Sequence, residues 1–290
     1  MDLPEPNISF REIADADIAP AVTLLARGFP RQGRETWLRA LQHLGNHQSP
    51  RGLPKYGYLM ECHGRAVGLI LTIFATVRSG DTQIVRCNPC AWYVEKPYRA
   101  FAGLLFAKAL MHEDVTYLDI SPAPDVEPII EALGFSRYCN GSFVAVPLFN
   151  ILSGEAGVRI LDARQQPSIK RDASDQDLLL AHADQDCISL WCETSDGAYP
   201  FVFRRRLARG FLPCAHLIYC RGVEDFVRFA GPLGRRLAMR GSFFVVIGSN
   251  GPVPGLVGTF LPGILPRYFK GPMQPGIGDI AFTEFGVLGI

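Results

Sequence analysis

Residues 92–104 form the segment of this sequence best suited to bind an anion. They read WYVEKPYRAFAGL, so an apolar strand pattern is followed directly by a helical one. The turn that opens a helix presents unpaired backbone N–H groups at the positive end of the helix dipole, where phosphate and pyrophosphate bind. Small residues at Ala100, Ala102 and Gly103 would let an anion approach the backbone. The same pattern also fits a strand-to-helix connection that binds nothing, and both interpretations stay open.

This junction matches neither common nucleotide-binding motif. GxxxxGK[ST] and GxGxxG are both absent from it. The second half of the chain offers no comparable turn, because Glu224 and Asp225 follow Gly222 at a predicted helix start. Acidic side chains at that position interact with the helix dipole in place of a bound phosphate.

Cys87 and Cys90 have the spacing of a redox or zinc motif. They do not begin a helix, and no second pair of cysteines or histidines follows at zinc-site spacing. Cys90, which we place on the same strand face as Trp92, has no nearby His that would activate it as a nucleophile. We interpret both as ordinary strand cysteines and expect all eight cysteines to be reduced thiols.

The apolar periodicity predicts the elements that position this junction. The first half should contain strands at 8–14, 56–62, 66–77, 84–94 and 115–121, helices at 18–29, 35–47, 99–110 and 125–133, and a hairpin at 135–147 that turns at Asn140-Gly141.

The second half should begin after a connection and follow a similar order. We expect helices at 175–192 and 223–240, strands at 200–206, 215–221, 243–247, 256–261 and 280–288, and no counterpart of the first strand and helix of the chain. Glu284 stands out as a polar residue on the last of these apolar strands. The segment 266–272, PRYFKGP, is a basic-aromatic loop that could form one wall of a cleft or pack its aromatic rings on the sheet.

Composition excludes several classes of protein. The chain has 290 residues, 48% of them hydrophobic, and a net charge of +1, which argues against disorder and against bulk binding to nucleic acid or anionic lipid. We interpret the basic run at Arg204, Arg205, Arg206 and Arg209 as a solvated face. No apolar stretch is long enough to span a membrane, and the polar, acidic N-terminus does not resemble a signal peptide. We therefore expect a cytoplasmic protein with no membrane or nucleic-acid partner.

Residues 92–99 resemble the central motif of the GCN5-related N-acetyltransferases, in which a strand of the type LYV-D-P-x-YR runs into a Gly-rich turn. Residues 129–135, IIEALGF, resemble that family's later lYexlGF segment. The helix and buried strand between the two also agree, as does the element order from Ile8 to Leu148. The second half of the chain resembles the family only by element order.

The resemblance implies acetyl-CoA or another acyl-CoA as co-substrate. In this family the ligand lies where two central strands splay apart, and its pantetheine pairs with the strand before the turn. Tyr93 and Val94 would then face the pantetheine. The pyrophosphate would bind the turn formed by Arg99, Ala100, Phe101, Ala102, Gly103 and Leu104.

Three residues depart from the family pattern. The family turn reads Q/R-x-x-G-x-G/A, whereas this chain has Ala102 and Leu104 at the two small positions, and Leu104 adds bulk beside the phosphate. Ile130 stands where many members carry the tyrosine that reprotonates the CoA thiolate. An isoleucine side chain exchanges no proton, so water or another group takes this role, or the domain is inactive.

The implied reaction transfers an acyl group from a thioester to an amine, or less often to a hydroxyl. It needs a base for the nucleophile and a proton for the thiolate. The carboxylates considered as base are Glu95, Asp119 and Glu61, of which Asp119 is preferred because it lies on a buried strand. Asp119 could also simply cap the following turn. Tyr138 is the alternative proton donor, unless it is an ordinary core aromatic.

We therefore expect an α/β fold with a mixed, mostly antiparallel central sheet flanked by helices, in two tandem units. The predicted division is an acyl-CoA-binding domain at 1–152, a linker at 153–174 and a degenerate second copy at 175–290. The expected function is an acyltransferase that acts on a small-molecule or peptide acceptor. The alternative is a catalytically silent domain of the same fold that binds acyl-CoA or a protein.

Overall fold

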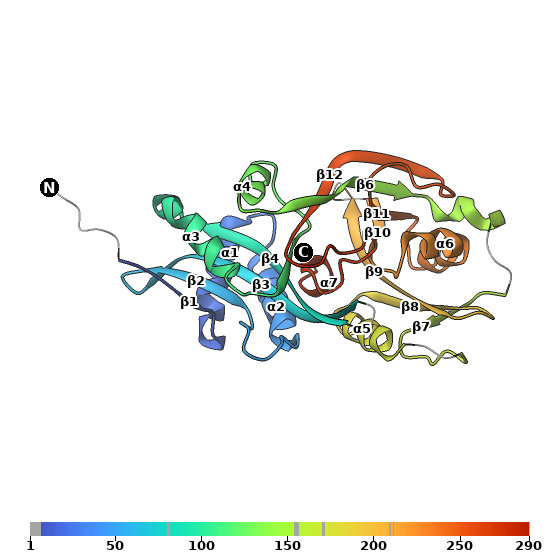
Figure 1. Ribbon diagram of the computed structural model, residues 1–290, viewed down its shortest axis with the longest axis horizontal. Helices are drawn as coiled ribbons and strands as arrows, with labels where there is room; N and C mark the ends of the chain where they lie inside the picture. The colour runs from blue at the N-terminus through green and yellow to red at the C-terminus, as the bar shows by residue number, and fades with distance from the viewer. Residues whose placement is uncertain are drawn as a thin grey trace. The chain divides into compact units, whose positions relative to one another are not determined.

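The computed structural model describes residues 7–79, 82–153, 157–169, 172–208, 210 and 212–289. The chain forms two compact units (Figure 1). The first unit comprises Met1–Asp119 and Phe282–Ile290, and the second unit comprises Ile120–Ala281. The linker predicted at 153–174 therefore falls inside the second unit, and the division into domains at that point stays a prediction.

The first unit contains five strands in the order β1-β2-β3-β4-β5. Neighbours pair antiparallel except β4 and β5, which are parallel and are joined through η2 and α3. The elements of this unit are β1 (Ile8–Glu12), η1 (Asp15–Asp17), α1 (Ile18–Gly28), α2 (Arg34–Asn46), β2 (Gly57–Cys62), β3 (Arg65–Ser79), β4 (Thr82–Val94), η2 (Lys96–Phe101), α3 (Ala102–Ala109), β5 (Val115–Asp119) and α7 (Glu284–Val287).

The core of the first unit lies where α1 and α2 pack on β3. Both helices are amphipathic, and their apolar residues at helical spacing are the buried ones, as Leu25 and Leu41 show. They meet alternate residues of β3, among them Leu71, and the C-terminal residues Val287 and Leu288. The segment that ends the chain is therefore part of the first unit's core.

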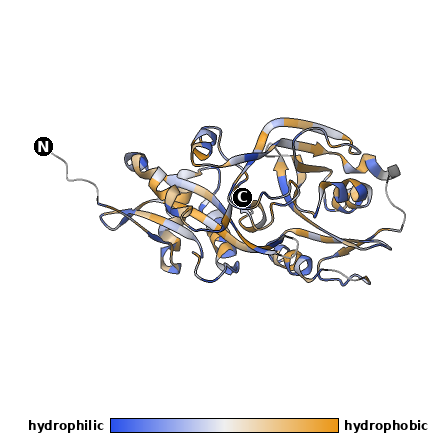
Figure 2. Ribbon diagram, in the orientation of Figure 1, coloured by the Kyte–Doolittle hydropathy of each residue, from blue (hydrophilic) through white to orange (hydrophobic). Residues whose placement is uncertain are grey.

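The second unit contains seven strands in the order β12-β6-β11-β10-β9-β8-β7. Among the described strands of this unit, β10 and β11 are the parallel pair, and α6 connects them. The α6 helix carries hydrophilic and hydrophobic residues (Figure 2), and it buries the hydrophobic ones, including Phe226 and Phe229. The elements of this unit are α4 (Glu127–Ala132), β6 (Ser136–Ala145), η3 (Pro147–Ser153), β7 (Arg159–Asp162), α5 (Ala173–Ala183), β8 (Ile188–Glu193), β9 (Ala198–Ala208), β10 (Leu212–Tyr219), α6 (Val223–Ala238), β11 (Phe244–Ser249) and β12 (Gly258–Lys270).

Each unit thus contains the same run of strands. β7-β8-β9-β10-β11 repeats the pairing of β1-β2-β3-β4-β5, including a single parallel pair reached through a helix. The predicted fold class, a mixed and mostly antiparallel sheet flanked by helices, is confirmed. The expectation that the second half lacks the opening strand and helix is wrong, because β7 and α5 supply them.

The helix predicted at 175–192 is two elements. The α5 helix ends at Ala183, Asp186 takes a positive φ of 60°, and β8 begins at Ile188. Every residue of β8 is buried. Its polar residues Ser189 and Glu193 are buried along with the apolar ones, so buried and exposed positions do not alternate along the strand and its sequence can be mistaken for a helix.

The hairpin predicted at 135–147 is instead one strand, β6. At its Asn140-Gly141 step the chain runs straight on, and β12 passes close to Gly141. A Cβ at this position would collide with the carbonyl oxygen of Leu261. The glycine therefore serves a close backbone approach and not a turn.

Two further expectations near the C-terminus are wrong. The loop predicted at 266–272 belongs mostly to β12, which ends at Lys270. The strand predicted at 280–288 is replaced by α7, because Phe282 adopts a positive φ of 57° and Thr283 is then the N-cap of a helix that begins at Glu284.

Among the described residues, no helix combines the length and apolar character that a membrane crossing requires.

Candidate functional site

The parallel strands β4 and β5 part soon after they meet. Their ladder pairs Val85–Cys87 with Val115–Tyr117, whereas β4 continues to Val94 and stays paired with β3 along its other edge. The main chain of β4 beyond Cys87 thus runs past the end of its ladder with β5. An extended amide-containing ligand can pair with such an edge.

A β-bulge at Ala91 changes which side chains of β4 share a face. Ala91 has φ 50°, and the register with β3 slips between Cys90 and Tyr93. Cys90 and Tyr93 consequently both pack in the core formed with α1 and α2. Trp92 instead contacts Phe106 of α3, with ring centroids 4.9 Å apart. The expectation that Cys90 and Trp92 share a face is wrong, since the extra residue of a bulge shifts the alternation.

The turn after β4 leaves a helix start open. Pro97 lies in the first turn of η2, and α3 begins at Ala102 with no side-chain cap from its N-cap residue Phe101 and no acid in its first turn. Gly103 is exposed, and a Cβ built on it would meet no described atom within 4 Å. Leu104 is 57% exposed. The N–H of Ala102 donates to the carbonyl of Arg99 in the preceding 3-10 helix, so an anion at this exposed turn would bind the N–H groups of the residues that follow.

Glu95, considered as a base, is held by two arginines. Its carboxylate lies 2.7 Å from Arg27 of α1 and 3.0 Å from Arg65 of β3. Its backbone N–H also donates to the carbonyl of Val67. These contacts secure the start of the turn, and they leave Glu95 poorly placed to take a proton from a substrate.

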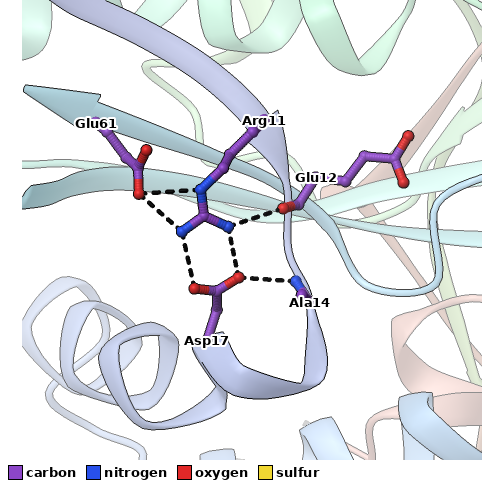
Figure 3. A network of polar contacts seen from close by, with 5 residues as sticks. All are labelled: Arg11, Glu12, Ala14, Asp17 and Glu61. Carbon is purple, nitrogen blue, oxygen red and sulfur yellow. Dashed lines mark hydrogen bonds and ion pairs between the residues drawn. The ribbon is translucent and has the colours of Figure 1, made fainter. Parts of the chain in front are cut away.

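Glu61 belongs to a surface network centred on Arg11 (Figure 3). Arg11 donates to Glu61 at 2.7 Å and to Asp17 at 2.5 and 2.8 Å, which links β1 with β2 and η1. The hydrogen bond from Arg11 lowers the pKa of Asp17. The role of Glu61 in this network is structural.

Asp119, Cys90 and Glu284 come together in the first unit. Asp119 is half-buried at the end of β5, and Glu284 is buried at the first residue of α7. Burial raises the pKa of the Cys90 thiol well above its ordinary value, and the charges of Glu284 and Asp119 and a hydrogen bond with Glu284 add to this. Cys90 is accordingly a neutral thiol, which argues against a nucleophilic role.

Asn88 is a residue that the sequence analysis missed. It is buried in β4, donates from Nδ2 to the carbonyl of Leu118 at 2.8 Å, and accepts at Oδ1 from the backbone N–H of Glu284 at 2.7 Å. The available signal was a polar amide between Cys87 and Pro89, in the part of the strand that continues as Cys90, Ala91 and Trp92. A buried polar group in such a place needs specific partners.

Other residues singled out from the sequence lie in the second unit. Tyr138 of β6 is buried with its ring edge-on to Phe269, at 5.9 Å between centroids, and Ile130 of α4 is fully buried. In β12, Tyr268 donates to Glu127 at 2.6 Å and Lys270 donates to the carbonyl of Leu133 at 2.7 Å. The basic-aromatic segment therefore fastens α4 to the sheet.

The basic run lies on a strand, and the cysteines lie in the interior of the protein. Arg204, Arg205 and Arg206 lie on β9, and Arg209 lies outside the described residues. All eight cysteines are buried and form no disulfide. The described part of the chain contains no cluster of three or more His, Cys, Asp or Glu residues that could hold a metal ion.

Comparisons with known proteins give the fold a name. No protein-family model matches the chain, and no curated protein matches it. Solved structures do. A candidate acetyltransferase from Pyrococcus horikoshii is 13% identical with a TM-score of 0.56, over 97% of this chain and 94% of that one. A GCN5-related N-acetyltransferase from Kribbella flavida is 14% identical with a TM-score of 0.57, over 91% of this chain and 71% of that one. A third, from Anabaena variabilis, is 10% identical with a TM-score of 0.57, over 91% and 72%. The chain therefore has the fold of the GCN5-related N-acetyltransferases.

Proposed function

We propose that this protein is an acyltransferase that moves an acetyl or other acyl group from acyl-CoA to an amine, or less often to a hydroxyl, of a small-molecule or peptide acceptor. One observation carries the proposal. In the first unit, β4 runs past its ladder with β5, bulges at Ala91, and enters a turn whose helix start is exposed and free of acids. A strand edge followed by an open helix start suits a ligand that has amides at one end and a pyrophosphate at the other.

The co-substrate is assigned to that path. The pantetheine amides pair with the main chain at Tyr93 and Val94, and the pyrophosphate accepts hydrogen bonds from the turn. Arg99 is exposed and can add charge to that contact. Ala102 and Leu104 depart from the family pattern without closing the turn, because Leu104 directs its side chain largely to solvent. The residues of the turn are Arg99, Ala100, Phe101, Ala102, Gly103 and Leu104.

The reaction forms one bond and breaks another. The acceptor nitrogen attacks the thioester carbonyl, the C–N bond forms, and the C–S bond breaks. A base removes the proton that the amine loses, and the thiolate takes up a proton. Asp119 is our proposed base, since Glu95 and Glu61 are engaged by arginines. Tyr138 is our proposed proton donor, because Ile130 has no proton to give.

Binding and turnover test the proposal separately. Calorimetry with acetyl-CoA and with desulfo-CoA should give saturable binding, and adenosine alone should not reproduce it. Release of free CoA thiol in the presence of an amine panel then reports catalysis. If neither CoA compound binds, the proposal is wrong. Binding without thiol release for any amine or hydroxyl acceptor would favour the catalytically silent alternative.

The assignments of base and acid have their own test. Asp119→Asn and Tyr138→Phe should each lower kcat by about 10²-fold or more, the usual contribution of general acid–base catalysis, while desulfo-CoA affinity stays unchanged. A variant that turns over at the wild-type rate has no such role.

A further inference from the structure

Asn88 occupies the point where the two parallel strands part. The last ladder pair is Cys87 with Tyr117, and Asn88 is the next residue of β4. Its side chain is 2% exposed and makes hydrogen bonds to two other segments of the first unit, at Leu118 and at Glu284. We infer that Asn88 is a positioning residue, which sets the spacing of β4 and β5 at the acyl-CoA site and seats the C-terminal segment beside it. This inference rests on the proposed function.

Asn88 bears on the spacing of β4 and β5 through its hydrogen bond to Leu118. Within a ladder, backbone N–H and C=O groups bond directly and the strands lie about 4.8 Å apart. At Asn88 the carbonyl of Leu118 is instead bound by a side-chain amide, 2.8 Å from Nδ2. A side chain thus takes the place of the next ladder bond. The amide satisfies a buried carbonyl while letting the two main chains diverge.

Asn88 also holds the C-terminal segment through its hydrogen bond to Glu284. The first N–H groups of a helix have no partner within the helix. At α7, one of them belongs to Glu284 and is bound by Oδ1 of Asn88 at 2.7 Å. This contact joins residues 196 positions apart in the sequence. It anchors α7, whose last residue Val287 packs with the following Leu288 in the same core as Cys90.

The single amide of Asn88 orders the main chain beside two carboxylates. Leu118 precedes Asp119 directly, and Glu284 itself carries the N–H that Asn88 binds. Asn88 therefore fixes the main chain on which both acidic side chains stand. Displacing a reacting group by about 1 Å can cost 10²-fold in rate, so the position of Asp119 matters to the proposed reaction.

The chemistry at this position is specific to a primary amide of this length. Aspartate keeps the acceptor for Glu284 but places a second oxygen against the carbonyl of Leu118. Leucine preserves the volume and loses both hydrogen bonds. Glutamine keeps the amide on a side chain one methylene longer. These three variants separate the donor, the acceptor and the reach of the group.

Asn150 offers a matched control in the second unit. It is also a buried asparagine, and its Nδ2 donates to the backbone carbonyl of Gly255. Asn150→Leu therefore removes a comparable buried hydrogen bond from a residue that has no part in the proposed site. It shows what a general loss of stability does to the same measurements.

The experiment compares Asn88→Leu, Asn88→Asp and Asn150→Leu with the wild type in the full chain. We expect Asn88→Leu to weaken desulfo-CoA binding and to lower kcat, each at least ten-fold, with Asn88→Asp in between and Asn150→Leu within two-fold of wild type. Hydrogen exchange of the peptide 283–289 should accelerate at least ten-fold in Asn88→Leu and stay unchanged in Asn150→Leu.

The outcomes are distinguishable. If wild type binds desulfo-CoA and folded Asn88→Leu matches it in affinity, rate and exchange, the role of Asn88 is wrong and the proposed function stands. If wild type binds no CoA compound, both are wrong. Should Asn88→Leu not fold, Asn88→Asp and Asn88→Gln decide. Wild-type affinity and rate in both of these folded variants would overturn the inference, and a graded loss would support it.

Discussion

Two strand–helix–strand crossovers in this molecule have the same topology and differ in what occupies the point where their parallel strands part. In the first unit, β4 leads through η2 and α3 to β5, and three residue pairs form the parallel ladder. In the second unit, β10 leads through α6 to β11, again with three pairs. The strand order around each is also the same. Because topology and ladder length are the same, any difference between the two crossovers comes from the residues at the helix start and at the strand edge.

The starts of the two helices differ in charge and in space. The first turn of α3 contains no acid, and Gly103 faces open space among the described residues. The first turn of α6 contains Glu224 and Asp225, and a Cβ on Gly222 would lie 2.8 Å from a carboxylate oxygen of Glu224. An anion can bind the first helix start, whereas side-chain carboxylates already occupy the second.

The strand edges differ as well. Beyond the ladder with β11, the edge of β10 pairs with residues 278–280. The Cys220 N–H donates to the carbonyl of Gly278, and the Ile280 N–H donates to the carbonyl of Ile218. The guanidinium of the buried Arg267 lies beside Gly248 and donates to the carbonyl of Ile277 at 2.7 Å. The edge that would receive a ligand is therefore filled. This topology can therefore bind a ligand only where the chain does not itself fill the strand edge and the helix start, and we expect one acyl-CoA per chain.

The largest expected effect tests the first helix start directly. Gly103→Asp places a carboxylate beside the pyrophosphate, so CoA affinity should fall by about 1–3 kcal/mol, the scale of a lost charge-assisted contact. Calorimetry measures the affinity and should also give a stoichiometry of one per chain for the wild type.

Gly251→Asp is the control, because Gly251 also faces open space and lies in the second unit. It adds the same charge and should leave CoA binding unchanged. Equal affinity in Gly103→Asp and wild type would remove the assignment of the pyrophosphate, and a stoichiometry of two would break the contrast between the crossovers.

The same small substitution should act differently at the two crossovers. A Cβ on Gly248 would lie 2.5 Å from Cζ of Arg267, which is buried and has little room to move. Gly248→Ala should therefore lower the free energy of unfolding by about 1–3 kcal/mol. Gly103→Ala fills open space in a helix and should leave stability equal or slightly higher. Urea denaturation measures both, and equal losses would mean that Arg267 does not fill the second crossover.

Acid should lower the free energy of unfolding through a residue of the second crossover, His216 of β10. Burial, with the charges of Arg267 and Arg206, lowers the pKa of His216 well below its ordinary value of 6.5. Below about pH 6.5 the unfolded chain takes up a proton there that the folded chain does not. Stability is therefore full above pH 6.5 and falls with acid by up to about 1.4 kcal/mol per pH unit.

Denaturation at pH 7.5 and pH 5.5 checks this dependence. His216→Asn should flatten it. His112, between α3 and β5, is only partly buried and has a pKa lowered first by desolvation, so His112→Asn should change the dependence less. If the free energy of unfolding of His216→Asn changed with pH as much as that of the wild type, His216 would not be the source of the pH dependence.

The smallest change in stability is expected for the surface network around Arg11, which lies outside both crossovers (Figure 3). Arg11→Ala should cost about 0.2–1 kcal/mol, because ion pairs at the surface are screened by solvent. Arg11 lowers the pKa of Asp17, so the contribution is present above about pH 3.8 and is lost as the pH falls through the folded pKa of Asp17. Thermal unfolding at pH 7 and pH 3 measures it. CoA affinity should be unaffected, and a change there would connect Glu61 with the site.

The features that depend on neighbours along the chain could be predicted from the amino-acid sequence. The helices α1 and α2 and the strands of the first unit could be predicted because their apolar residues recur with a period of 3.6 or alternate in strands. The junction at 92–104 could be located because strand, turn and helix follow one another directly. The acids at the start of α6 were visible for the same reason.

Tertiary structure alone decided the features that depend on distant partners. Asn88 binds residues 30 and 196 positions away, so no local pattern could reveal its role. Glu95 and Glu61 were plausible bases until the arginines beside them were seen. Gly141 predicted a turn because its real reason, the approach of β12, lies in another segment. Local periodicity records which face of an element is buried, and it carries no information about what is packed against that face.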